Sequence, residues 1–225
     1  IFHELEQPVY IADYEHLGVY ACRILVPGMS DIYPVEDLLL ANNTMGAHLR
    51  ETILALPALE WDAEQYMALF DQLDEEGHDE RTRVRELLGI AAAKGTALHT
   101  LRVGELKAML ALAAGDLESA LDLIDWTMEF NQSVFPADRA AYYRALRACV
   151  ELFLDEERDP EQYRPVFARM FGEETLAQAW ANARGEARFH GLEAADLSLS
   201  QFPLHQKLLA AYEKLQKAKR IHTWN

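Results

Sequence analysis

Apolar residues recur along most of this chain at the spacing of amphipathic helices. One run of four positions follows the i, i+3, i+4, i+7 pattern of a single helix face: Tyr66, Leu69, Phe70 and Leu73. Asp62 precedes the run and Gln65 stands three residues later, which is the sequence pattern of a capping box. We therefore predict a helix that begins at Asp62 and ends near Gly77.

Residues 105–130 predict two helices joined by a tight turn. Gly115 and Asp116 separate two apolar stripes, so they should end the first helix and cap the second. The stripes consist of Leu106, Leu110 and Ala113 in the first helix and Leu117, Ala120, Leu121, Ile124 and Met128 in the second. The pattern indicates a helical hairpin.

This hairpin partly matches a tetratricopeptide repeat. Small residues at Ala108 and Ala120 would let the two helix backbones approach closely, as they do in that repeat. Thr127 and Gln132 stand where the repeat usually has Ala and Pro. A second helical pair, 136–154 and 160–172, differs in length and residue pattern, so we describe the region as repeat-like.

Further helices are predicted on both sides of these pairs. One helix is predicted to begin at Pro34. A second covers 81–92, where the apolar positions are Val84, Leu87 and Leu88, and two more cover 173–184 and 203–220. Asp159 followed by Pro160 is a strong helix start. Pro165 is expected to kink the helix that begins there. Two helices carry explicit apolar stripes: Tyr163, Val166, Phe167, Met170 and Phe171 in one, and Leu204, Leu208, Ala211, Tyr212 and Leu215 in the other.

The first residues alternate differently and predict a β-hairpin. Residues 8–13 and 19–26 are rich in Val, Ile and Tyr, and a short polar stretch separates them. The second strand is apolar on both faces apart from Arg23, which is typical of a strand covered on both sides. Two strands alone are marginal in water, so we expect the rest of the sheet to precede Ile1.

These patterns predict a mainly α (α+β) fold in two parts. Residues 1–33 are interpreted as the terminal strands of an upstream α/β domain, and 34–225 as a helical, tetratricopeptide-like domain. At 225 residues and 50% hydrophobic content, the chain can bury a sizeable core.

The charge of the chain narrows the classes of partner that it can bind. Lys and Arg number 21 against 37 Asp and Glu, a formal charge of −16 that repels nucleic acid and anionic lipid. A basic protein is the favoured partner, and neither nucleic acid nor a membrane is expected.

Cys22 and Cys149 are interpreted as reduced, small core residues. Without a run of about 20 apolar residues or a signal peptide, we predict a cytoplasmic protein.

A search for catalytic and metal-binding signatures yields none, so we assign no catalytic, cofactor-binding or metal-ligating residue. The segment GIAAAKGT at 89–96 reads Lys-Gly rather than Gly-Lys and follows a helix, which argues against a phosphate loop. DQLDEEGHDE at 71–80 has the wrong spacing for calcium and is interpreted as a solvated acidic turn. The scattered histidines have no i, i+4 pairing. Apart from His3, they are His16, His48, His78, His99, His190, His205 and His222.

Two weaker features allow a binding interpretation. Five aromatic residues fall along the central hairpins. They either line a groove for a peptide or pack between helices, and core packing is the favoured interpretation. They are Trp126, Phe130, Phe135, Tyr142 and Tyr143. The last helix is basic, which also complements its helix dipole. Its cations are Lys207, Lys214, Lys217, Lys219 and Arg220.

Several segments, taken in order, closely resemble the C-terminal portion of the bacterial YcaO family. They are VYIADYEHLGVYACRILVPGMSDIYPVEDL, TRVRELLGIA, LRVGELKAMLALAAGDLESAL, RMFG and AYEKLQKAKR. The resemblance implies a parent that is an ATP-dependent enzyme activating peptide amides. More narrowly, it implies the subgroup that is accessory to β-methylthiolation of a small-subunit ribosomal protein. Azoline-forming members usually end in a proline-rich tail, whereas this chain ends RIHTWN.

The same resemblance places ATP and magnesium in the upstream domain, and none of its acidic ligands maps onto 1–225. Three hypotheses follow for the chain itself. It is a non-catalytic association domain that dimerises or docks a basic ribosomal protein or peptide, a structural cap of the upstream domain, or a self-contained enzyme built from dispersed carboxylates.

Overall fold

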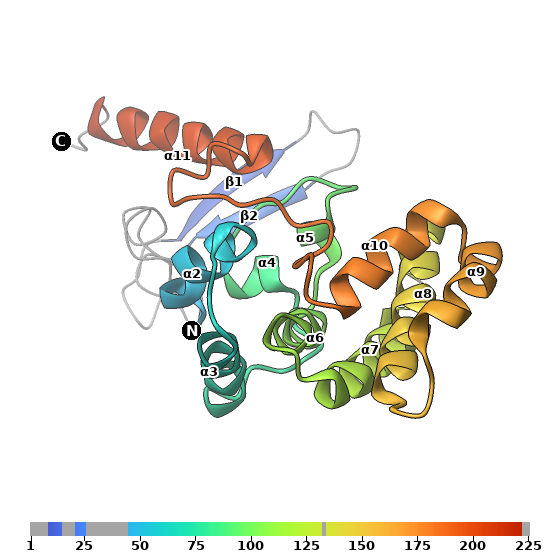
Figure 1. Ribbon diagram of the computed structural model, residues 1–225. Helices are drawn as coiled ribbons and strands as arrows, with labels where there is room; N and C mark the ends of the chain where they lie inside the picture. The colour runs from blue at the N-terminus through green and yellow to red at the C-terminus, as the bar shows by residue number, and fades with distance from the viewer. Residues whose placement is uncertain (1–8, 15–20, 26–44, 132–133, 222–225) are drawn as a thin grey trace. The chain divides into compact units, whose positions relative to one another are not determined.

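The computed structural model describes residues 9–14, 21–25, 45–131 and 134–221 (Figure 1). The chain divides into two compact units, Thr44–Leu208 on the one hand and Ile1–Asn43 with Leu209–Asn225 on the other. The described part of the chain is mainly helical, as predicted. No helix in that part combines the length and the apolar character that a membrane crossing requires.

The larger unit is built from a succession of helices with short connections. Its helices are α2 (Arg50–Ala55), α3 (Ala63–Glu75), α4 (Val84–Leu87), α5 (Ala97–Thr100), α6 (Val103–Ala114), α7 (Leu117–Asn131), α8 (Ala137–Leu154), α9 (Pro160–Phe171) and α10 (Glu173–Ala183), together with the first residues of α11 (Pro203–Ile221). Two 3-10 turns, Ala47–Leu49 and Leu56–Ala58, flank α2. In chain order, α3 packs on α6, α6 on α7 and α7 on α8, and α8 then packs more extensively on α10 than on α9.

Local capping explains why several helices begin and end where predicted. The Asp62 carboxylate accepts the Gln65 amide N–H at 2.9 Å, and the Gln65 side chain accepts the Asp62 N–H at 3.1 Å, which completes the capping box of α3. Asp159 likewise accepts the Glu161 N–H ahead of Pro160. Gly115 takes a left-handed conformation, φ 80°, between α6 and α7. The predicted helical hairpin is confirmed at this turn.

Helix α6 lies between two hydrophobic cores. Its Val103, Leu106 and Leu110 belong to a core shared with α2, α3 and α4, whereas its Ala108 and Ala111 belong to a second core shared with α7, α8 and α10. A Cβ on Gly104 would lie 2.6 Å from the Trp126 ring of α7, so glycine is required for this close approach. Sequence patterns alone did not reveal this contact.

Even the Lys107 side chain of α6 is buried, which requires compensation of its charge. Its Nζ donates to Asp74 of α3 at 2.6 Å and to Glu80 at 3.1 Å, and it lies 4.7 Å from the centre of the Phe70 ring. The acidic segment 71–80 therefore supplies partners for a buried lysine, beyond forming a solvated turn.

One predicted helix needs correction, and two predicted apolar stripes are only partly buried. The helix expected over 81–92 is a single turn, α4, because Gly89 adopts φ 64° and because Arg50 binds the Leu88 carbonyl through Nε at 2.8 Å and Nη2 at 2.6 Å. Val166 and Met170 of α9 are exposed, as are Leu204 and Leu208 of α11, so these stripes are not fully buried. The helix start at Pro34 and the boundary at 33/34 lie outside the described residues.

The smaller unit contains two paired strands. Strand β1 (Tyr10–Tyr14) runs antiparallel to β2 (Ala21–Leu25), with Ile11 opposite Ile24 and Asp13 opposite Cys22. Paired residues point to the same face of a sheet, and Ile11, Ile24 and Cys22 are all exposed. Cys149 is buried as predicted, but the prediction that Cys22 is a core residue is wrong because this face is open to solvent.

Candidate functional site

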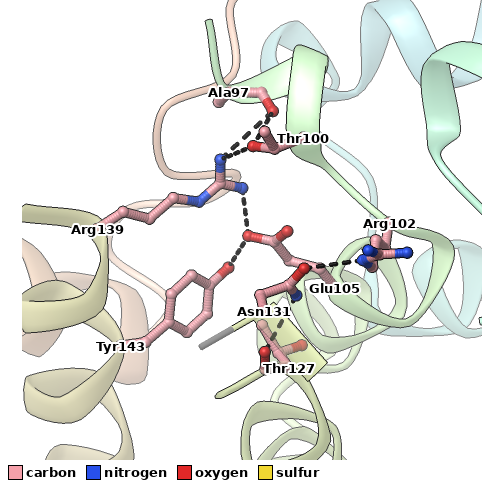
Figure 2. Close-up of polar contacts among 8 residues, drawn as sticks. All are labelled: Ala97, Thr100, Arg102, Glu105, Thr127, Asn131, Arg139 and Tyr143. Atoms are coloured by element: carbon pink, nitrogen blue, oxygen red, sulfur yellow. Dashed lines mark hydrogen bonds and ion pairs between the residues drawn. The ribbon is translucent and has the colours of Figure 1, made fainter. Parts of the chain in front are cut away.

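A buried polar network joins α6 to α8 in the interior of the larger unit (Figure 2). Its centre is Glu105, which is 0% exposed. The Glu105 Oε1 atom accepts hydrogen bonds from the Tyr143 hydroxyl, at 2.6 Å, and from the Arg139 guanidinium. Glu105 Oε2 has no hydrogen-bond partner among the residues that the structure describes. Because only one oxygen of this buried carboxylate accepts hydrogen bonds, its stability depends strongly on Tyr143 and Arg139.

Arg139 extends the network toward the surface. Its Nη1 donates to the Thr100 hydroxyl at 2.9 Å and to the Ala97 carbonyl at 3.4 Å, which ties α8 to α5. Its guanidinium carbon lies 4.9 Å from the centre of the Phe135 ring. The side chain is only 13% exposed, and two groups of α5, the Glu105 carboxylate of α6 and the Phe135 ring together fix its orientation.

A second set of contacts supports the start of α6 from the other side. Arg102, immediately before α6, donates through Nε to the Asn131 side-chain oxygen at 2.8 Å, and Asn131 donates to the Thr127 carbonyl at 3.0 Å (Figure 2). Asn131 and Thr127 are both buried. The first turn of α6 is therefore held from both α7 and α8.

The surroundings of Glu105 and Tyr143 shift the pKa of both groups. Burial raises the pKa of Glu105 above its ordinary value, although the charge of Arg139 and the Tyr143 hydrogen bond lower it. Burial also raises the pKa of Tyr143 well above its ordinary value, and the Glu105 charge adds to the effect. Tyr143 therefore remains a neutral donor to Glu105 at physiological pH.

A cleft of about 690 Å³ lies over Arg139. Its walls come from the 94–100 segment, the start of α8, the start of α10 and the loop at His190 and Gly191. The His190 ring stacks on the Tyr142 ring, with centroids 3.8 Å apart. Phe189, the residue before His190, has φ 53°, a conformation that non-glycine residues rarely adopt and that is often retained at functional sites.

Several polar groups of this cleft have no hydrogen-bond partner among the described residues. Tyr142 is 4% exposed, yet its hydroxyl has none, and neither does the His190 ring. His99 donates through Nδ1 to the Ala92 carbonyl at 3.0 Å, which leaves its Nε2 as an acceptor. These groups offer neutral donors and acceptors to a molecule in the cleft.

An apolar cavity of about 380 Å³ adjoins the cleft. The two share four lining residues, Gly95, Thr96, Ala97 and Gly191. The apolar walls come from α2, α5 and the segment before α11, including Leu54, Leu98 and Phe202. The cleft and the cavity are thus neighbouring pockets that share the 95–97 segment as a wall, one with polar lining and one with mainly apolar lining. We call the two together the 95–97 groove.

The groove presents hydrogen-bonding, charged and apolar groups to a ligand. Glu105 is the buried carboxylate beneath it and is sealed from solvent, so it cannot exchange a proton directly with a ligand. No group of three metal-ligating side chains is found among the described residues. Glu105 positions Arg139 instead, and Arg139 forms part of the cleft wall.

The structure divides the aromatic cluster proposed from sequence. Tyr142 and Tyr143 lie in the core, Phe135 stacks on Tyr143, and Trp126 packs on Phe130 with centroids 4.8 Å apart. Core packing, the favoured interpretation, accounts for most of the cluster, but Tyr142 also faces the cleft.

The predicted histidines are dispersed. His99 and His190 line the cleft, whereas His48 and His78 both contact Glu76, at 2.9 and 2.8 Å. The contact with Gln72, followed by that with His48, lowers the pKa of Glu76 to about 2. His205 is buried at the start of α11 and accepts the Ala91 N–H at 3.2 Å. His16 and His222 lie outside the described residues.

Sequence reasoning missed Glu105, Arg139 and the 95–97 groove. Glu105 and Arg139 are 34 residues apart, so no local motif joins them. One signal was available: Glu105 falls at the start of a helix with few other polar residues, which indicates either a cap or a buried carboxylate in need of a partner.

Comparison with known proteins places the chain in a family. It is 61% identical over 219 residues to the ribosomal protein S12 methylthiotransferase accessory factor YcaO of Escherichia coli, which covers 97% of this chain and 37% of that protein. It is 53% identical over 221 residues to an uncharacterized protein of Haemophilus influenzae, which covers 98% of this chain and 38% of the relative. The chain thus spans less than two fifths of the length of these curated relatives. Residues 46–221 match the YcaO cyclodehydratase C-terminal domain, and because this match covers most of the chain, the chain belongs to the YcaO family.

Proposed function

We propose that this chain is a non-catalytic association domain in the C-terminal portion of a YcaO-family protein. The observation that carries the proposal is the 95–97 groove, whose exposed chemistry is limited to hydrogen bonding, charge and apolar contact, while its buried carboxylate is sealed. Such a surface suits recognition of a polypeptide. The α6–α7 hairpin, which we interpret as tetratricopeptide-like, forms part of the scaffold under the groove.

The rest of the proposal concerns the parent protein. We propose that it is an ATP-dependent, peptide-amide-activating enzyme that binds ATP and magnesium in an upstream α/β domain, and that β1 and β2 are the last strands of that domain. Its role would match that of the E. coli relative, an accessory factor of the ribosomal protein S12 methylthiotransferase. We propose that the parent protein performs this role in the cytoplasm.

The charge of the chain favours a basic partner over an acidic one. At a formal charge of −16, it attracts basic ribosomal proteins and accelerates their encounter at low ionic strength. Titration of the chain with ribosomal protein S12, and separately with the S12 methylthiotransferase, tests the proposal by isothermal calorimetry at low and high salt. Binding of either protein at low salt is expected, and absence of binding to both refutes the association role.

Self-association through the helical domain is the other form that this role can take. Light scattering coupled to size exclusion distinguishes the two forms, because a dimer points to assembly and a monomer to docking. A dimer that persists when Ile11 and Ile24 are replaced with Thr uses the helices. A dimer that dissociates in this variant uses the strands.

A second candidate function, a structural cap of the parent domain, rests on the open face of the strands. Val9, Ile11 and Ile24 expose apolar side chains there, and such surface is usually covered in the whole protein. Removal of residues 44–225 from the parent tests this role. An insoluble remainder favours the cap, whereas a folded remainder that no longer binds its partner favours association.

A further inference from the structure

The charges along the 95–97 groove point to a particular kind of occupant. Asp138 and Glu174 line the cleft, Glu193 lines the apolar cavity, and none of the three carboxylates has an ion-pair partner among the described residues. Lys94 is the opposing charge without such a partner, because Glu105 balances Arg139. The groove therefore carries an excess of uncompensated negative charge.

The neutral groups in the groove point to a peptide backbone. The Tyr142 hydroxyl has no hydrogen-bond partner among the described residues and is accessible from the cleft that Tyr142 lines. The His190 ring and the His99 Nε2 atom lie in the same cleft. An extended peptide presents amide donors and carbonyl acceptors at regular intervals and would satisfy these groups together.

The adjoining cavity offers a place for an apolar side chain of the same peptide. Leu54, Leu98 and Phe202 form an apolar recess that begins at the same 95–97 segment where the polar cleft ends. The recess is large enough to hold an apolar side chain, and burial of that side chain would anchor a peptide whose neighbouring residues lie in the cleft. Charge, backbone recognition and an apolar anchor thus occur in two neighbouring pockets that share the 95–97 segment.

We propose that the 95–97 groove binds an extended peptide segment in which Arg or Lys stands beside an apolar residue. The apolar side chain occupies the cavity, the basic side chain pairs with Asp138, Glu174 or Glu193, and the peptide backbone bonds to Tyr142 and His190. This inference rests on the proposed association function and specifies its partner by chemistry.

The test uses a fluorescein-labelled, end-capped peptide, Gly-Ser-Leu-Arg-Ser-Gly, and fluorescence anisotropy with the 225-residue chain. Two matched peptides replace the Arg with Glu or the Leu with Ser. We expect the first peptide to bind best and each replacement to weaken binding by about tenfold, since an ion pair or an anchor in a pocket contributes about 1 to 2 kcal/mol. Equal binding of the three peptides, or no binding of any, overturns the proposal.

Variants of the chain locate the site. Glu193→Lys should weaken the Arg peptide by about tenfold and strengthen the Glu peptide, because the reversed charge attracts the reversed ligand. Tyr142→Phe, which keeps the packing, should weaken the Arg peptide by about threefold or more. Asp122→Lys, an exposed change on α7 outside the groove, is the matched control and should leave binding unchanged. Equal effects of Glu193→Lys and Asp122→Lys contradict the site.

Two further outcomes separate this inference from the proposed function. If Glu193→Lys and Tyr142→Phe bind S12 or the methylthiotransferase as well as the unaltered chain does, the association role stands and the groove assignment is wrong. If the unaltered chain binds neither protein but still selects the Arg peptide, the groove assignment stands without that role. A chain dimer that Glu193→Lys dissociates would identify a second copy as the occupant and refute the peptide proposal.

Discussion

Replacement of Arg139 by Met should reveal how much the larger unit depends on its buried ion pair. Glu105 would keep the Tyr143 hydrogen bond but lose its counter-charge, in a site with no solvent access. Removal of one partner from a buried pair typically costs about 3 to 5 kcal/mol, because the remaining charge is buried and uncompensated. We therefore expect Arg139→Met to lower the free energy of unfolding by about 3 to 5 kcal/mol at neutral pH.

The cost should depend on pH in a defined direction. Burial already raises the pKa of Glu105 in the folded state, and loss of Arg139 raises it further. The folded state then binds a proton that the unfolded state releases above about pH 4.3, so stability falls as the pH rises from there to the folded-state pKa. The deficit of Arg139→Met relative to the unaltered chain is thus smallest near pH 5 and grows toward pH 8.

Urea denaturation followed by far-ultraviolet circular dichroism measures this deficit at several pH values. Arg147→Met on the same helix is the matched control, since its partners Asp125 and Glu151 are about half exposed and should cost under about 1 kcal/mol. The double variant Glu105→Gln with Arg139→Met removes both charges and should abolish the pH dependence. A deficit equal to that of Arg147→Met at every pH would refute the reasoning.

Three further predictions follow from individual contacts. Gly104→Ala places a Cβ 2.6 Å from Trp126 and should lower the free energy of unfolding by about 1 to 3 kcal/mol, a loss that Trp126→Phe partly restores and that chemical denaturation measures. Burial, followed by the charge of Arg50, lowers the pKa of His205, so the free energy of unfolding should fall as the pH drops below about 6.5. This pH dependence should weaken in the His205→Asn variant. An unchanged pH profile in that variant would contradict the prediction. Burial raises the pKa of the Cys149 thiol to about 12, so Ellman's reagent should label exposed Cys22 in the native chain and Cys149 only after unfolding, as the Cys22→Ser and Cys149→Ser variants would verify.

Helix positions were predictable wherever the signal is local. The Asp62 box, the Asp159-Pro160 start and the Gly115 turn each lie within a few residues of sequence, and each directs the backbone at the expected place. The error over 81–92 has a tertiary cause. Val84 N–H donates to the Leu101 carbonyl at 2.9 Å and Arg50 takes the Leu88 carbonyl, so the segment is held by distant residues after one helical turn.

The candidate site was beyond sequence reasoning for the same reason. Glu105, Arg139 and Tyr142 meet only because α6 and α8 pack around α7, and the groove also needs the loop at His190. Apolar spacing identifies a stripe without saying what covers it, which is why Val166 and Met170 share the pattern of buried residues and are exposed.

The position of α6 between two hydrophobic cores limits how this unit can be divided. Neither core is complete without α6, because Leu106 and Leu110 fill one while Ala108 and Ala111 fill the other. If the chain is cut at Gly115, the C-terminal fragment lacks the α6 residues of its hydrophobic core. If it is cut before Val103, the N-terminal fragment lacks the α6 residues of the other core. Residues 45–208 should therefore melt in a single transition, and reassembly from split halves should require both pieces together.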